Sequence, residues 1–189
     1  MTKGFSRLKP TPAEMAAAAG RTIADVAAPD LRVLFCGINP GLYSAATGFH
    51  FARPGNRFWP ALHQSGFTPR LLRPDEQHLL LESGLGITNL VDRATARADE
   101  LSAAELAAGA SRLAAKATAL RPRWLAIAGV TAYRAAFARP RAVVGPQDES
   151  AGPARIWVLP NPSGLNAHWT APRLVQAFTD LRLQAEASQ

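Results

Sequence analysis

The segment Val33–Gly41 reads VLFCGINPG, a short apolar run that passes directly into a turn of Gly, Asn and Pro. The same arrangement returns at Ile156–Asn166, which reads IWVLPNPSGLN. Short apolar runs bounded by turn residues are typical of strands buried in a parallel sheet. Ligands of open α/β sheets bind at the carboxyl ends of such strands. The two loops are therefore predicted to meet at one sheet edge and to close on a small polar ring.

The rest of the chain alternates apolar runs with helical patterns, and this alternation predicts the fold class. Strands that alternate with helices favour an α/β fold, here a three-layer α/β/α sandwich with a short central parallel sheet. Residues 1–189 are predicted to form a single domain, with 1–30 as a peripheral segment. Two stretches, 37–55 and 140–153, are predicted as loops. Strands are predicted at 32–36, 86–91, 124–128 and 155–159, and helices at 13–19, 56–66, 75–82, 102–120, 130–137 and beyond Thr170.

Composition narrows the possible partners. The net charge of +7 favours an anionic partner such as nucleic acid, although an Arg-rich composition also arises in GC-rich genomes. There is no apolar run long enough to cross a membrane, and no apolar signal core follows Lys3, Arg7 and Lys9. One cysteine, Cys36, excludes an internal disulfide and indicates a cytoplasmic protein. The histidines show no shared ligand spacing, so neither a metal nor another cofactor is predicted.

The first loop continues as Leu42–Trp59, which reads LYSAATGFHFARPGNRFW and mixes aromatic, small and arginine side chains. Together with Asn161–Asn166, Gly86–Arg93 and Ile156–Pro160, this block closely resembles the mismatch-specific uracil-DNA glycosylases, relatives of thymine-DNA glycosylase. The resemblance covers about residues 32–183. It implies the same α/β/α fold and an enzyme that flips a base out of duplex DNA before breaking its N-glycosidic bond.

The resemblance also implies roles for individual residues in the pocket. Asn39 would orient the attacking water, because an amide has no titratable group near neutral pH and cannot act as a true general base. Phe51 would be the floor on which the flipped ring stacks, although a simple core position for Phe51 stays open. Tyr43 and Ser44 would lie beside the pyrimidine 5-position. The complete set implied for base binding is Ile38, Gly41, Tyr43, Ser44, Phe51 and Asn161.

Two further groups of residues would contact the duplex. Leu165 would enter the base stack as a wedge, with Gly164 and Asn166 meeting the base left opposite. Phosphate contacts are expected from Arg53, Arg57 and His168. Separately from the resemblance, Asp92 follows the predicted strand 86–91 at the same sheet edge. It is a candidate catalytic carboxylate, and a structural role at the turn is the alternative.

These features predict a monofunctional DNA glycosylase, because no lysine is placed as a nucleophile for a Schiff base. It would act as a monomer on double-stranded DNA with G·U mismatches, leaving an abasic site. Other modified pyrimidines, such as thymine or etheno-cytosine, would be weaker substrates. One alternative is a non-catalytic damaged-DNA binding module of the same fold, and another is a hydrolase of free nucleotides, which would need no wedge.

Overall fold

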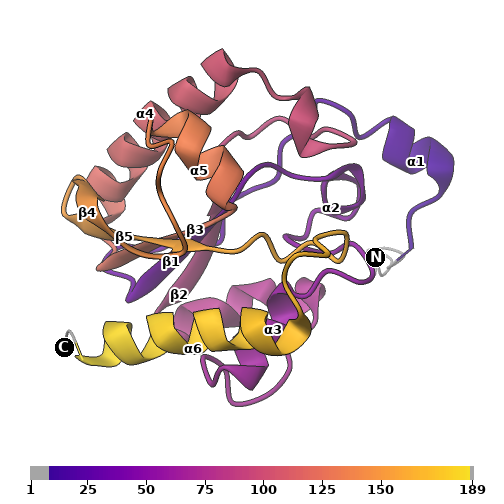
Figure 1. The fold of residues 1–189 in the computed structure, drawn as a ribbon. Helices are drawn as coiled ribbons and strands as arrows, with labels where there is room; N and C mark the ends of the chain where they lie inside the picture. Colours follow the sequence, from indigo (N-terminus) through magenta and orange to yellow (C-terminus); the bar gives the residue numbers. More distant parts are fainter. Residues whose placement is uncertain (1–8, 188–189) are drawn as a thin grey trace.

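A computed structural model describes residues 9–187; Lys3 and Arg7 lie outside the described residues. Its centre is a five-stranded sheet in the order β2-β1-β3-β5-β4 (Figure 1). β1 pairs in parallel with β2 and β3, and β3 pairs in parallel with β5. The carboxyl ends of these strands therefore share one edge. The strands are β1 (Val33–Gly37), β2 (Leu85–Asn89), β3 (Trp124–Ala128), β4 (Gly145–Ala151) and β5 (Ala154–Leu159).

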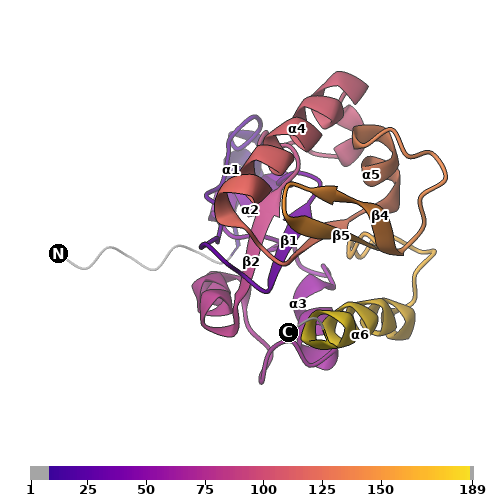
Figure 2. The same cartoon turned by 90° about the vertical axis from the view of Figure 1, so that its left-hand side faces the viewer.

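Helices cover both faces of the sheet, which confirms the three-layer sandwich (Figure 1, Figure 2). Successive strand residues point to opposite faces. Thus Phe35 packs with Phe58 of α3 and Phe178 of α6, whereas Leu34 and Leu113 belong to the core beneath α4 and α5. The helical segments are α1 (Pro12–Ala16), α2 (Leu42–Thr47), α3 (Phe58–Gln64), η1 (Pro74–Ser83, a 3₁₀ helix), η2 (Ala98–Glu100), α4 (Ala103–Leu120), α5 (Val130–Ala136) and α6 (Ala171–Ala187).

The capping signals that mark helices in the sequence are present in the structure. Ser102 and Glu105 form the expected capping box at the start of α4. The side chain of Asn56 accepts a hydrogen bond from the Phe58 N–H at 2.9 Å, at the start of α3. The segment predicted as a helix over 75–82 is a 3₁₀ helix. Local side-chain chemistry thus indicates where α3 and α4 begin.

Two elements lie in stretches that were predicted as loops. α2 occupies Leu42–Thr47, between Gly41 as its N-cap and Gly48 in the left-handed conformation that ends it. β4 occupies Gly145–Ala151 and pairs antiparallel with β5, so the parallel sheet carries one antiparallel edge. β4 was missed because an edge strand needs little apolar sequence and tolerates Pro146.

The N-terminal segment, predicted to be peripheral, is tied to the sheet. Val26 forms an antiparallel bridge with Ile87 of β2. Asp25 pairs with Lys116 of α4 at 2.5 Å, and both side chains bond the Thr88 hydroxyl. Residues 20–28 therefore run antiparallel to β2 along its free edge, away from the carboxyl ends of the strands. The assignment of the whole chain to a single domain stays a prediction.

Among residues 9–187, no helix combines the length and the apolar character needed to span a bilayer.

Gly109 tests the contact between α4 and Leu90, the residue that follows β2. A glycine-to-alanine change inside a helix normally stabilises it by about 1 kcal/mol. Here the added Cβ would overlap the main-chain carbonyl of Leu90. Gly109→Ala is therefore expected to destabilise the protein by about 1–3 kcal/mol, as overpacking does. Urea unfolding should show this, while Ser111→Ala on the exposed side of α4 should stay within about 0.5 kcal/mol of wild type. A stabilised Gly109→Ala would contradict the packing described.

Candidate active site at the carboxyl edge of the sheet

A cavity of about 170 Å³ lies where β1, β2, β3 and β5 end. The chain reverses its direction of winding between β1 and β3, and this is where open α/β sheets bind ligands. The first loop (residues 38–57, which includes α2) and the loop at 160–170 lie side by side there (Figure 1). Of the residues predicted to form the site, the cavity is lined by Ile38, Asn39, Gly41, Ser44, Phe51, Arg53 and Asn161.

The amide of Asn39 is held in one orientation. Its nitrogen donates to the carbonyl oxygen of Arg93 at 2.8 Å and to the Thr95 hydroxyl at 2.7 Å. Thr95 in turn donates to the carbonyl of Arg97, so its hydroxyl oxygen accepts from Asn39. A carbonyl can only accept, and this settles which amide atom is the nitrogen. Asn39 therefore offers its Oδ1 as a hydrogen-bond acceptor.

Phe51 forms an aromatic wall of the cavity. Its ring stacks on Phe58 with centroids 4.1 Å apart and planes 17° apart, and it also lines the cavity. The backbone of Phe51 has φ 52°, which is uncommon for a side chain other than glycine. A Cβ on Gly37 would lie 3.2 Å from this ring and 2.8 Å from Asn89 Oδ1. Gly37 therefore lets Phe51 and Asn89 approach each other across the end of β1.

His50 and Asn89 form a buried pair that sequence reasoning missed as part of the site. His50 Nε2 lies 3.0 Å from the carbonyl of Ala24, so that nitrogen carries the proton. Nδ1 is then an acceptor, and Asn89 Nδ2 lies 3.4 Å from it. This contact orients the Asn89 amide and leaves its second N–H and Oδ1 for other partners. The position of Asn89 at a strand end could have indicated a site residue. Its pairing with His50, however, depends on tertiary packing.

The cavity combines a positive rim with an interior of amides and hydroxyls. Arg53 and Arg97 line it, and Arg97 also pairs with the exposed Asp99 at 3.0 Å. No aspartate or glutamate is among the described residues that line it. Ile23, from the N-terminal segment, completes one side. Across residues 9–187 there is no group of three acidic, cysteine or histidine side chains suited to hold a metal ion.

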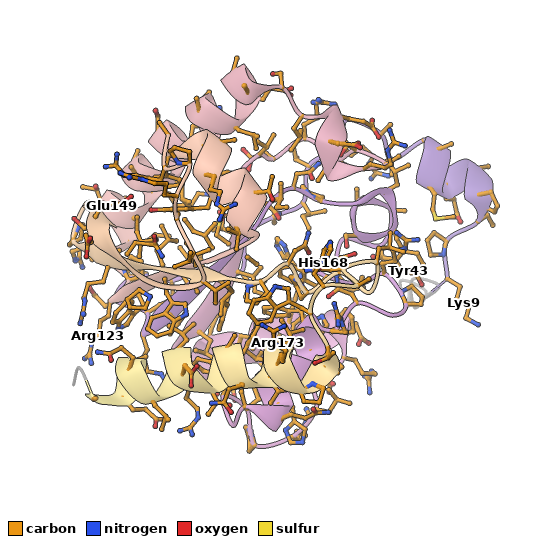
Figure 3. The ribbon with its side chains drawn as sticks, in the orientation of Figure 1. Lys9, Tyr43, Arg123, Glu149, His168 and Arg173 are labelled. Atoms are coloured by element: carbon orange, nitrogen blue, oxygen red, sulfur yellow. The ribbon has the colours of Figure 1, made fainter. Side chains whose placement is uncertain are left out.

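Asp92 is not brought to this cavity. β2 ends at Asn89, and the following turn leaves Asp92 exposed in a separate shallow hollow beside α4, together with Arg112. The prediction that Asp92 reaches the pocket is therefore wrong. A position at the sheet edge alone does not decide on which side of the turn a side chain emerges. Tyr43 is also absent from the cavity lining, whereas its neighbour Ser44 is present. Figure 3 shows Tyr43 near the end of the molecule that carries α1 and α2.

The loop at 160–170, here called the wedge loop, holds Leu165 in solvent. The Leu165 side chain is 75% exposed, the highest value among the large exposed apolar residues described. Asn161 organises the loop: its Oδ1 accepts from the Ser163 N–H at 3.0 Å, and its carbonyl accepts from Asn166 Nδ2 at 3.0 Å. Gly164 lies against the carbonyl of Gly55 in the first loop. An exposed leucine on an internally bonded loop is suited to contact another molecule.

The three predicted phosphate contacts have different environments. Arg53 is exposed and lines both the cavity and the hollow beside Gly164 and Leu165. His168 is exposed at a neighbouring hollow next to Trp169, on the side of the molecule that carries the loops (Figure 3). The guanidinium of Arg57 instead donates to main-chain carbonyls of the wedge loop. Both terminal nitrogens of the guanidinium are bonded within the protein and its Nε is buried, so the structure does not present Arg57 as a free phosphate contact.

The pH dependence of stability should report His50. Burial is the main cause that lowers the pKa of His50 below its ordinary value, and the Ala24 carbonyl opposes it. As pH falls below about 6.5, the unfolded chain takes up this proton before the folded protein does, so stability is lost. His50→Gln should show a shallower decrease in Tm between pH 7.5 and pH 5, by calorimetry. The exposed control His78→Gln should follow wild type; equal slopes for all three would contradict a buried neutral His50.

Comparisons with known proteins agree with this architecture. Residues 24–182 match the family model of the Uracil DNA glycosylase superfamily. The fold is also similar to the solution NMR structure of a "putative Uracil DNA glycosylase" from Methanosarcina acetivorans, with a TM-score of 0.60 and 17% sequence identity. That match covers 88% of this chain and 98% of the other, and at this identity it supports the fold. Because the family model spans most of its length, the chain belongs to the uracil-DNA glycosylase superfamily.

Proposed function

We propose that this protein is a monofunctional DNA glycosylase that flips uracil out of mismatched double-stranded DNA and hydrolyses its N-glycosidic bond. Membership of the superfamily supports uracil excision in general. The observation that carries the finer proposal is the fixed amide of Asn39, which offers an acceptor in a cavity that Phe51 walls. Double-stranded DNA is the proposed partner. The monomeric state and the cytoplasmic location stay predictions.

Base recognition follows from the fixed amide of Asn89. Uracil presents an N3–H donor beside a carbonyl acceptor, and a primary amide offers the matching acceptor and donor. Cytosine reverses this pattern. Asn89 can match cytosine only by rotating its amide, which would turn Oδ1 towards the acceptor nitrogen of His50. The His50–Asn89 pair therefore favours uracil over cytosine, with the ring stacked on Phe51.

Hydrolysis breaks the bond between the sugar C1′ and the base N1. The oxygen of a water forms the new bond to C1′, the bond electrons leave with the base as an anion, and a proton passes from the water to solvent or to that anion. Asn39 Oδ1 would accept a hydrogen bond from the water and so aim its oxygen at C1′. Because no carboxylate is among the described residues that line the cavity, catalysis would rest on positioning and on the stabilisation of the anion by loop N–H groups. A slow enzyme is expected.

The preference for mismatches follows from the energy of base flipping. Extrusion of a base requires a few kcal/mol and requires least where pairing is already weak. Leu165 would occupy the vacated stack and hold the opening. Ser44, which the family resemblance places beside the pyrimidine 5-position, is small and lines the cavity, whereas Tyr43 does not. A small residue there leaves room for substituents, so thymine and etheno-cytosine are proposed as weak substrates.

Asn39 provides the decisive test. Asn39→Ala should lower the rate of uracil release from a G·U duplex by about 10²- to 10³-fold, the usual effect of removing one polar catalytic contact. Asp92→Asn, the matched control at the same sheet edge, should stay within about twofold because Asp92 does not reach the cavity. Release is measured with a labelled duplex and cleavage at the abasic product.

Failure of wild type to release uracil from any DNA would refute the proposed function. Binding of mismatched DNA without release would then favour a non-catalytic damage-binding module. Release from deoxyuridine monophosphate but not from DNA would favour a nucleotide hydrolase. An Asp92→Asn protein as impaired as Asn39→Ala would contradict the assignment of the acceptor to Asn39.

The wedge can be tested separately from the chemistry. Leu165→Ala should lower uracil release from a G·U duplex by about 10- to 100-fold, because the few kcal/mol of unstacking are no longer offset by an inserted side chain. Release from a three-base bubble with uracil at its centre should change much less, since that uracil is already unstacked. Equal losses on the two substrates would argue against a wedge at Leu165.

A further inference from the structure

We propose that Arg57 is a positioning residue for Leu165: its guanidinium sets the shape of the wedge loop and thereby couples the first loop to the opening of the duplex. This inference rests on the proposed function. It assigns to Arg57 a role inside the protein. The first loop and the wedge loop then act as one unit, although more than a hundred residues separate them in the chain.

The contacts of Arg57 bracket the wedge. Its guanidinium donates to three main-chain carbonyls at 2.5 to 3.0 Å. One precedes Leu165, at Ser163, and two follow it, at Asn166 and Trp169. In addition, the main-chain N–H of Arg57 donates to the carbonyl of Pro162 at 2.9 Å. A single residue of the first loop thus binds the wedge loop on both sides of its exposed leucine.

An arginine side chain is well suited to make this set of contacts from one position. The guanidinium is planar, carries five N–H donors in a fixed fork and stays charged. A lysine at the same position would keep the charge but present it as a compact ammonium. The three carbonyls are brought to one cation from both sides of Leu165, which itself is exposed.

Arg57 differs from the arginines that serve an ion pair. None of the salt bridges among residues 9–187 includes Arg57, and its Nε is buried without a hydrogen-bond partner in that part of the chain. Burying part of a cation without a carboxylate partner costs desolvation free energy and is a poor means of stabilising the fold. The arrangement of Arg57 is explained if its role is to set the geometry of the wedge loop.

A second contact limits the movement of the wedge loop. Gly164, next to Leu165, packs on the carbonyl of Gly55 so closely that an added Cβ would overlap it. The wedge loop is therefore held both by Arg57 and by Gly55. Such a pre-shaped loop loses little conformational freedom when its leucine enters DNA, and this favours insertion.

The test compares two substrates in each variant. Uracil release is measured from a G·U duplex and from the three-base bubble. The rate on the duplex is then divided by the rate on the bubble to give a duplex-to-bubble ratio. This ratio is independent of how much of a preparation is folded. Arg57→Lys is expected to lower the ratio by about tenfold or more, because the charge remains but the loop geometry is lost. Arg182→Lys is the matched control: Arg182 also donates to a carbonyl, that of Ser65, but lies on α6. Its ratio should equal that of wild type.

A double substitution identifies the route of the effect. If Arg57 acts through Leu165, adding Arg57→Lys to Leu165→Ala should not lower the ratio further. A 2-aminopurine opposite an uncleavable 2′-fluoro-deoxyuridine should also brighten less with Arg57→Lys than with wild type, without any chemistry taking place.

Three results would overturn the inference: a wild-type ratio in Arg57→Lys, an equal loss on both substrates, or a full additional loss in the double variant. Each of these requires an active wild-type enzyme. A wild-type protein that releases uracil from neither substrate would instead refute the proposed function.

Discussion

The two hydrogen bonds that fix the Asn39 amide are the constraint on which the site depends. They connect the loop after β1 to the turn after β2, so the position of the acceptor is set by the sheet rather than by the side chain alone. Since none of the described residues that line the cavity is a carboxylate, a correctly aimed water would be the chief contribution of these residues to the proposed hydrolysis. In the proposed function, Phe51, His50 and Asn89 would complement it by fixing where the base lies.

The two loops at the carboxyl edge of the sheet have different proposed roles, one in hydrolysis and one in opening the duplex. The first loop supplies the cavity, and the wedge loop supplies an exposed leucine that would hold a duplex open. Arg57 joins the two, since it belongs to the first loop and binds carbonyls on both sides of Leu165. This linkage gives a physical reason for an arginine without a carboxylate partner among the described residues. If Arg57 positions Leu165 as proposed, a change in the first loop would also alter the opening of the duplex.

Much of the fold could be predicted because its signals are local. Apolar runs locate the parallel strands to within about one or two residues, and Ser102 marks the start of α4. The polar edge strand β4 lacks an apolar run by which to predict it. The short helix α2 lies between two glycines, Gly41 and Gly48, in a stretch whose composition is typical of a loop. The family resemblance predicts Asn39 as a site residue, and Asn39 does line the cavity. The side on which Asp92 emerges and the pairing of His50 depend on tertiary contacts that no local pattern encodes.

The central claim is that a flipped uracil lies against Phe51 and faces a water aimed by Asn39. A crystal structure with a duplex that contains 2′-fluoro-deoxyuridine opposite guanine tests it most directly, because this sugar resists cleavage. The account predicts the base stacked on Phe51 with its edge towards Asn89, and a water bonded to Asn39 Oδ1 on the side of C1′. A uracil bound elsewhere, or an Asn39 amide with its nitrogen turned to the sugar, would contradict it.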